Sequence, residues 1–178
     1  MTNKKFYSKK ISNILIISSS MKYFKKIEDS LKFLKKENDK SFYKVNKYLK
    51  IIFITDKVKF FNELFTKDRI WMTGYNIFNE KTYDFKYIAS LFLHESHHIT
   101  QYLSGHKNTG TKAEKMAYLI QRRFLKKIKY NDAVKWLDDQ YKDKWWKLMN
   151  KDEKNKNYFR KLLSLYKNKK LKIRNVKI

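Results

Sequence analysis

Short apolar runs in the first part of the chain predict strands. The runs at residues 11–17 and 50–56 are rich in β-branched side chains, which is typical of buried strands. A third strand is expected at 69–79, where Gly74 indicates a bulge or a close approach of two backbone segments. Residues 58–65, between the last two runs, predict a short helix or a turn. We therefore expect a small N-terminal mixed sheet.

Helical periodicity covers most of the remaining chain. One helix is expected at 21–34 and another at 43–49, both before the strand at 50–56. After the strands, apolar positions recur with helical spacing in four further segments. These segments are 83–103, 111–129, 131–149 and 158–166. Because the strands come first and the helices follow, the pattern predicts an α+β fold.

The length of 178 residues suits one domain with a core of its own. We expect this domain to span 1–149, and 150–178 to add a short helix and a basic tail that is frayed or strand-like. The apolar run at 14–17 is shorter than the ~7–15 residues of a signal-peptide core, and no stretch approaches the ~20 apolar residues of a membrane span. These features slightly favour a cytoplasmic location, whereas the compartment and the oligomeric state stay open.

A formal net charge of +26 raises the alternative of a basic nucleic-acid-binding module. Lysine supplies most of this charge, however, and lysine lacks the planar fork with which arginine binds phosphates and bases. Proline is absent, glycine is scarce, and Lys, Asn, Ile, Tyr and Phe abound, as an AT-rich coding sequence would produce. We therefore expect nucleic-acid binding to be weak and non-specific.

The strongest chemical pattern is His94-Glu95-Ser96-His97-His98, which matches H-E-x-x-H. On a helix, His94 and His98 lie one turn apart, on the side opposite an apolar face, so both imidazoles can reach one metal ion. There is no cysteine, so the remaining ligands must be His, Asp or Glu. Zinc bound by two imidazoles and a third ligand keeps a position for water, from which Glu95 could take a proton. A structural zinc site without turnover is the alternative, but it would not need Glu95.

With this motif, the chain resembles the zincin metallopeptidases, and more narrowly the small gluzincin-type H-E-x-x-H-x-x-Q domains. Gln101 supplies the final glutamine, and the resemblance covers about residues 70–120. The metzincin pattern does not fit, because it needs Gly and His where this chain has Gln101 and Ser104. The resemblance implies a zincin-like fold, one Zn²⁺ per chain, a peptide or protein substrate, and hydrolysis by a zinc-bound water that Glu95 activates.

In such domains a glutamate on the helix after the motif completes the zinc site. Glu114, followed by Ala117 three residues later, matches that position. His106, just beyond the end of the motif helix, is the alternative third ligand. We favour Glu114 because a helix holds a ligand more firmly than a loop does.

The resemblance also implies residues that contact the substrate. Gly74, Tyr75 and Asn76 are expected on an edge strand that pairs with an extended peptide. Tyr118 is the candidate for stabilising the oxyanion of the transition state, with Tyr102 as an alternative. His97 lies on the flank of the motif helix and is expected to support a ligand residue or lie at the surface, without binding the metal itself.

Overall fold

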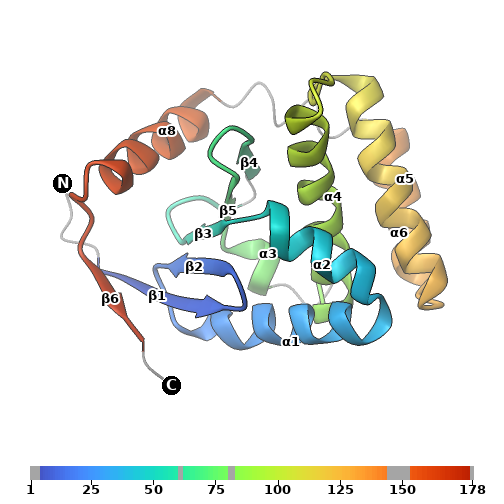
Figure 1. Cartoon of the computed structure of the whole chain (residues 1–178), viewed down its shortest axis with the longest axis horizontal. Coiled ribbons are helices and arrows are strands. Elements are labelled where there is room, and N and C mark those ends of the chain that lie inside the picture. The colour runs from blue at the N-terminus through green and yellow to red at the C-terminus, as the bar shows by residue number, and fades with distance from the viewer. Residues whose placement is uncertain (1–4, 60–61, 80–82, 144–152, 177–178) are drawn as a thin grey trace.

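Among the residues that the structure describes, six strands form one mixed sheet (Figure 1). The structure is a computed structural model, and it describes residues 5–59, 62–79, 83–143 and 153–176. The strands are β1 (Phe6–Ile11), β2 (Ile14–Ser18), β3 (Ile51–Thr55), β4 (Asn62–Phe65), β5 (Ile70–Gly74) and β6 (Ile173–Asn175). Their order in the sheet is β4-β5-β3-β2-β1-β6, so β4 and β6 lie at its two edges.

The directions of the strands explain the first helices. Strands β2, β3 and β5 run parallel to one another, whereas β1 and β4 run antiparallel to their neighbours β2 and β5. Parallel neighbours need a crossover connection, and α1 (Lys22–Glu37) with α2 (Asp39–Tyr48) provides it between β2 and β3. A mixed sheet combined with helices confirms the expected α+β class.

The other described helices follow β5 along the chain. They are α3 (Asn76–Asn79), α4 (Phe85–Leu103), α5 (Thr111–Lys127), α6 (Asn131–Lys142) and α8 (Glu153–Lys167). Helix α4 packs against α1 and α5, and α5 packs against α6. In Figure 1, α4, α5 and α6 stand together beside the sheet, while α8 lies apart from them.

Helices cover both faces of the sheet. Successive residues of a strand point to opposite faces, so the neighbours Trp71 and Met72 belong to different cores. On one face, Trp71 packs in a core that includes Phe92 of α4 and residues of α1 and α2. On the other face, Met72 packs with Phe159 of α8. Each side of the sheet therefore has its own apolar layer, and α4 is held directly against the strands.

The helix or turn predicted at 58–65 is wrong for its second half, since Asn62–Phe65 is the edge strand β4. Pairing with β5 decides which face of the sheet each side chain of β4 points to. Leu64 contacts the core on the α4 side, and Phe65 contacts the core on the α8 side. This long-range pairing overrides the weak local preference of a four-residue segment. Residues 60–61 lie outside the described residues.

The strand predicted at 69–79 is also shorter than expected. It ends at Gly74, and the segment that begins at Asn76 turns into the short helix α3. The close backbone approach predicted at Gly74 is confirmed, because an added Cβ would lie 2.6 Å from the carbonyl oxygen of Val58. The N–H of Tyr75 donates to that same carbonyl at 3.2 Å. A side chain at Gly74 would thus force the two segments apart.

The C-terminal segment joins the sheet. The helix predicted at 158–166 begins earlier, at Glu153, and the strand-like alternative for the tail is confirmed by β6, which pairs in parallel with β1. Segment 153–176 therefore adds a strand to the sheet that the first residues form, and a helix that packs against that sheet. Of the helix predicted at 131–149, residues up to Lys142 are helical, and 144–149 lie outside the described residues.

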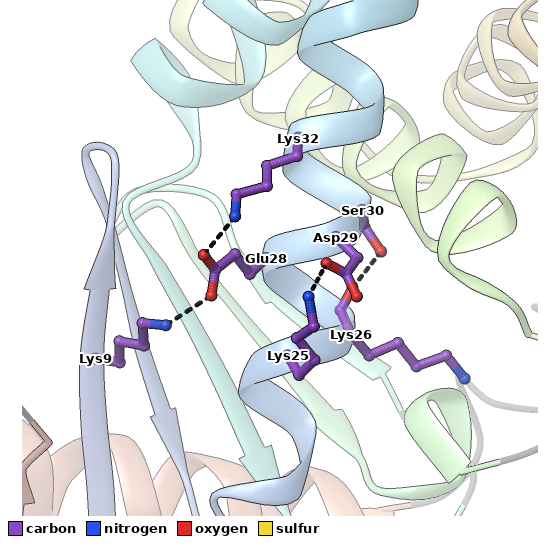
Figure 2. Close-up of polar contacts among 7 residues, drawn as sticks. All are labelled: Lys9, Lys25, Lys26, Glu28, Asp29, Ser30 and Lys32. Atoms are coloured by element: carbon purple, nitrogen blue, oxygen red, sulfur yellow. Dashed lines mark hydrogen bonds and ion pairs between the residues drawn. The ribbon is translucent and has the colours of Figure 1, made fainter. Parts of the chain in front are cut away.

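A carboxylate between two lysines ties α1 to β1 (Figure 2). The Oε atoms of Glu28 lie 2.7 Å from Nζ of Lys9 and 2.9 Å from Nζ of Lys32. Hydrogen bonds from these two ammonium groups, only partly opposed by burial, lower the pKa of Glu28 to about 2 from its ordinary value of 4.5. Because the pKa is depressed in the folded state, this stabilisation is present above about pH 4.5 and is lost as the pH falls towards 2.

The change Glu28→Gln should therefore lower the free energy of unfolding by about 0.5–1 kcal/mol at pH 7. Most of that difference should be lost at pH 2. Urea denaturation at the two pH values measures it. Asp29→Asn is the matched control, because Asp29 forms an exposed ion pair with Lys25 on the same helix and should change stability little (Figure 2). An equal loss of stability for Glu28→Gln at both pH values would show that ionised Glu28 is not the source of the pH dependence.

Candidate metal centre

Helix α4 carries the two motif histidines. The side chain of Asp84 accepts a hydrogen bond from the backbone N–H of Tyr87 at 2.9 Å and so caps the start of the helix. One face of α4 is buried in the core beneath the sheet, through Ile88, Ala89, Phe92 and Ile99. His94 and His98 lie one turn apart on another face, and their Nε2 atoms are 3.2 Å apart.

Helix α5 brings a carboxylate to this pair. Gly105 and Gly110 adopt φ values of 73° and 87°, a left-handed region that favours glycine, and the chain between them turns back so that α5 packs along α4. The Glu114 carboxylate oxygens lie 3.5 Å from Nε2 of His94 and 3.6 Å from Nε2 of His98. The three ligand atoms lie within 4.8 Å of one another and could hold a metal ion.

A buried hydrogen-bond chain orients His94. The hydroxyl of Ser90 donates to the carbonyl of Tyr87 at 2.6 Å, so its oxygen accepts from Nε2 of Gln121 at 3.0 Å. Gln121 therefore presents its carbonyl oxygen to Nδ1 of His94, 3.1 Å away. This arrangement places a proton on Nδ1 and turns Nε2 of His94 towards the cluster, as a metal-ligating histidine requires.

Gln101 has the same role beside His98. Its side-chain oxygen lies 3.2 Å from Nδ1 of His98, one turn further along α4. Accepting from Nδ1 leaves Nε2 of His98 facing His94 and Glu114. The glutamine of the H-E-x-x-H-x-x-Q pattern thus contacts the second histidine directly.

The cluster is electrostatically coupled. Burial opposes ionisation of Glu114, but the adjacent rings of His94 and His98 outweigh it, and the pKa of Glu114 lies well below its usual range. Burial likewise opposes charge on His94, and the neighbouring Glu114 carboxylate more than compensates, so the pKa of His94 is raised. Glu114 is therefore an anion at neutral pH, as a carboxylate ligand must be.

Glu95 lines the same cleft as the three ligand residues. Its side chain is buried, with 8% of the residue exposed, and burial raises the pKa of its carboxyl, an effect that the nearby histidines partly offset. A carboxylate with a raised pKa accepts a proton more readily than one in water. The site therefore combines three ligand atoms with a separate group suited to proton transfer.

His97 and His106 lie outside the cluster. His97 is half-buried on another side of α4, and burial together with the charges of His98, His94 and Lys44 lowers its pKa to about 4. His106 is exposed, and its Nδ1 lies 2.9 Å from the carbonyl oxygen of Ser104. Of the two candidate third ligands, Glu114 is the one that the structure brings to the histidine pair.

The expected oxyanion residue is otherwise engaged. Tyr118 lines the cleft, but its hydroxyl donates to Asp138 at 2.7 Å, and Arg122 binds the same carboxylate through Nε and Nη2. Burial and the hydrogen bond to Asp138 raise the pKa of Tyr118 to about 12. A role for Tyr118 at the transition state would require this hydrogen bond to break. The alternative, Tyr102, is partly exposed at the end of α4.

The predicted edge strand is in the wrong place. Gly74 pairs with Thr55 of β3 and ends an interior strand, while Tyr75 and Asn76 lead into α3. Of the two edge strands, β4 is the one that reaches the cleft, where Asn62, Glu63 and Leu64 are among the lining residues. The prediction failed because β4 is short and its pairing with β5 is not visible in local periodicity.

Sequence reasoning also missed Gln121 and Ser90 as supports of the site. Gln121 is 1% exposed and Ser90 is fully buried. A signal was present, since Gln121 follows Glu114 by two helical turns and so shares its face of α5. A buried glutamine on that face needs a polar partner, and His94 across the helix pair provides one.

Gln121→Leu should therefore weaken the affinity for a divalent metal ion by about 10- to 100-fold, because His94 loses the acceptor that orients its ring. Gln121→Glu keeps an acceptor at that position and should retain most of the affinity. Competition with a chromophoric chelator measures the dissociation constants, and thermal unfolding of the metal-free variants controls for loss of fold. Unchanged affinity in Gln121→Leu would show that the hydrogen bond does not orient the ligand.

No family model, curated protein or solved structure matches the chain. The described helices include none that is long and apolar enough to cross a membrane. On its fold and site, the chain is an α+β protein with a His-His-Glu group that could hold a metal ion.

Proposed function

We propose that the protein is a zinc-dependent metallopeptidase. The observation that carries this proposal is the position of Glu95 in one cleft with His94, His98 and Glu114. The three ligand residues would hold the metal, and Glu95 is then the carboxylate in the same cleft that is available as a general base. The resemblance of H-E-x-x-H-x-x-Q to the gluzincin-type peptidases supports the same assignment.

The donor set and its spacing fit zinc. Two imidazole nitrogens and one carboxylate form a ligand set of catalytic zinc sites, with bonds of about 2.0–2.2 Å. Tetrahedral ligands at that distance stand about 3.3–3.6 Å apart. The Nε2 atoms of His94 and His98 are 3.2 Å apart, one carboxylate oxygen of Glu114 lies 3.5 Å from Nε2 of His94, and the other lies 3.6 Å from Nε2 of His98. Little movement of the side chains is needed for them to share one ion.

The opening of the site favours turnover over a structural role. Structural zinc sites are closed by four protein ligands, whereas catalytic sites keep a position for water or substrate. Here the ligand residues line a cleft, and the described residues supply three ligands to the group. The non-catalytic zinc domain is therefore the less favoured alternative.

In the proposed hydrolysis, the metal and Glu95 have different roles. Zinc, when bound, makes a coordinated water more acidic and polarises a peptide carbonyl. Glu95 takes the proton from the attacking water as the new C–O bond forms, and passes it to the amide nitrogen as the C–N bond breaks. The products are a carboxylic acid and an amine, and Glu95 returns to its carboxylate form.

Strand β4 is suited to align the substrate. In the part of the chain that the structure describes, β4 pairs with β5 on one side, and its residues Asn62, Glu63 and Leu64 line the cleft. An extended peptide can add to such an edge through main-chain hydrogen bonds. We therefore propose β4, in place of the interior segment at Gly74, as the strand that pairs with the substrate.

The test is digestion of a peptide library by purified protein, with mass spectrometry of the products. Cleavage should stop on treatment with a chelator of divalent metals and return on addition of one equivalent of zinc. Absence of cleavage by fully zinc-loaded protein across a library of diverse sequence would overturn the peptidase assignment. Cleavage that a chelator leaves unchanged would overturn the role of the metal.

A further inference from the structure

The cleft extends beyond the metal cluster towards α6. Leu91 lies one turn before His94 on α4, and Tyr118 lies one turn after Glu114 on α5. Because α5 turns back along α4, these two steps lead in the same direction. Leu137 and Tyr141 of α6 also line this part of the cleft. We call Leu91, Tyr118, Leu137 and Tyr141 the apolar compartment.

The walls of the apolar compartment are held in place. The rings of Tyr118 and Tyr141 stack with centroids 4.1 Å apart and planes inclined by 20°. Leu137 is buried in a core with Tyr87 and Leu125, and Leu91 and Tyr118 pack against the same core. The hydroxyl of Tyr118 is fixed by its hydrogen bond to Asp138. A site with walls held in this way is preorganised for a ligand of defined shape.

The apolar compartment lacks the basic residues that are abundant in the rest of the chain, among the described residues that line it. Lysine and arginine make up 43 of the 178 residues, yet neither occurs among the described residues that line the cleft. Burial raises the pKa of the hydroxyls of Tyr87 and Tyr118, so both rings stay neutral. Asp138, the carboxylate bonded to Tyr118, is already bound by Arg122. An acidic side chain entering here would lose water without gaining a counter-charge, whereas an apolar one would gain by burial.

We propose that the apolar compartment receives a large apolar or aromatic side chain of the substrate, next to the peptide bond that is cleaved. The inference rests on the proposed peptidase function and adds to it a substrate class. Peptides with Leu, Met, Phe or Tyr at that position are preferred over peptides with Ala, and acidic side chains are disfavoured. The basic surface of the protein does not set this preference, since no described residue that lines the cleft is a lysine or an arginine.

Hydroxamates of single amino acids test the compartment without turnover. The hydroxamate group binds the metal, and the side chain reports on the neighbouring space. Isothermal titration of zinc-loaded Glu95→Gln protein should show the phenylalanine and leucine hydroxamates binding about 10- to 100-fold more tightly than alanine hydroxamate. Aspartate hydroxamate should bind less tightly than alanine hydroxamate.

Two variants locate the effect. Leu91→Trp, made in the same Glu95→Gln protein, fills the compartment and should bring phenylalanine hydroxamate to within about threefold of alanine hydroxamate. Met116→Trp adds the same ring to an exposed position of α5 outside the cleft lining and should leave the preference unchanged. Zinc content and thermal unfolding confirm that each variant is loaded and folded.

The outcomes distinguish this inference from the function on which it rests. Equal binding of all hydroxamates, or tightest binding of aspartate or lysine hydroxamate, would overturn the compartment even if peptides are cleaved. Selective binding of phenylalanine hydroxamate that Leu91→Trp removes would support the compartment. If that selectivity occurs in a protein that cleaves no peptide, the peptidase assignment fails and the apolar subsite stands.

Discussion

Replacing Glu95 with glutamine should lower peptide hydrolysis by ~10²-fold or more while the protein keeps its metal. Glutamine has nearly the same shape as glutamate, so the buried position can accept it without a cavity or a clash. The amide cannot take a proton from water, so the step that makes water nucleophilic is lost. Because Glu95 is not among the three ligand residues, zinc affinity should change little.

The measurement is kcat/KM on a fluorogenic peptide chosen from the library digestion, with zinc content determined on the same samples. Glu37→Gln is the matched control, because Glu37 lies at the end of α1 outside the cleft lining and should leave the rate within about twofold. Near-normal turnover in zinc-loaded Glu95→Gln would assign the proton transfer to another group. Loss of zinc in that variant would mean that Glu95 contributes to holding the ion.

Alanine at any of the three ligand positions should remove most of the bound metal. Wild-type protein should hold about one zinc per chain, and His94→Ala, His98→Ala and Glu114→Ala should each weaken binding by ~10²-fold or more, because a ligand bond is lost. His106→Ala serves as the internal control. His106 is exposed and separate from the cluster, so its replacement should leave metal content and hydrolysis nearly unchanged.

Elemental analysis after dialysis against a weak chelator gives the stoichiometry, and circular dichroism of the metal-free proteins controls for loss of fold. Full zinc retention in any one of the three ligand variants would remove that residue from the site. Metal loss in His106→Ala together with retention in Glu114→Ala would move the third ligand to His106 and leave the histidine pair in place.

The motif helix could be predicted closely because its signals are local. The predicted segment 83–103 corresponds to α4, Phe85–Leu103, with Asp84 as its cap and Gly105 just beyond its end. Helical geometry alone sets His94 and His98 on one face, away from the residues that pack under the sheet. The close backbone approach at Gly74 could also be predicted from local sequence, because a glycine inside a strand usually marks a bulge or a close contact between backbone segments.

The third ligand could be predicted only in part from the sequence. The helical pattern after residue 111 placed Glu114 on the face that also carries the small Ala117, which favoured a contact with α4. Whether the carboxylate reaches the histidines depends on the turn between Gly105 and Gly110 and on how closely the helices pack, and these are tertiary properties. Fully buried Ala117 shows that the helices do meet on that face.

Other features of the site were decided only by the fold. Strand β4 becomes the sheet edge because it pairs with β5, and β6 joins the sheet because Arg174 lies opposite Tyr7, from the other end of the chain. Gln121 reaches His94 from a different helix. Sequence periodicity by itself determined the existence of the longer helices and the side of α4 that carries the chemistry, because neighbours within one helix are related by fixed geometry. The tertiary structure decided the edge strand, the orientation of the ligands and the walls of the cleft, because these contacts join residues whose spacing no local period relates.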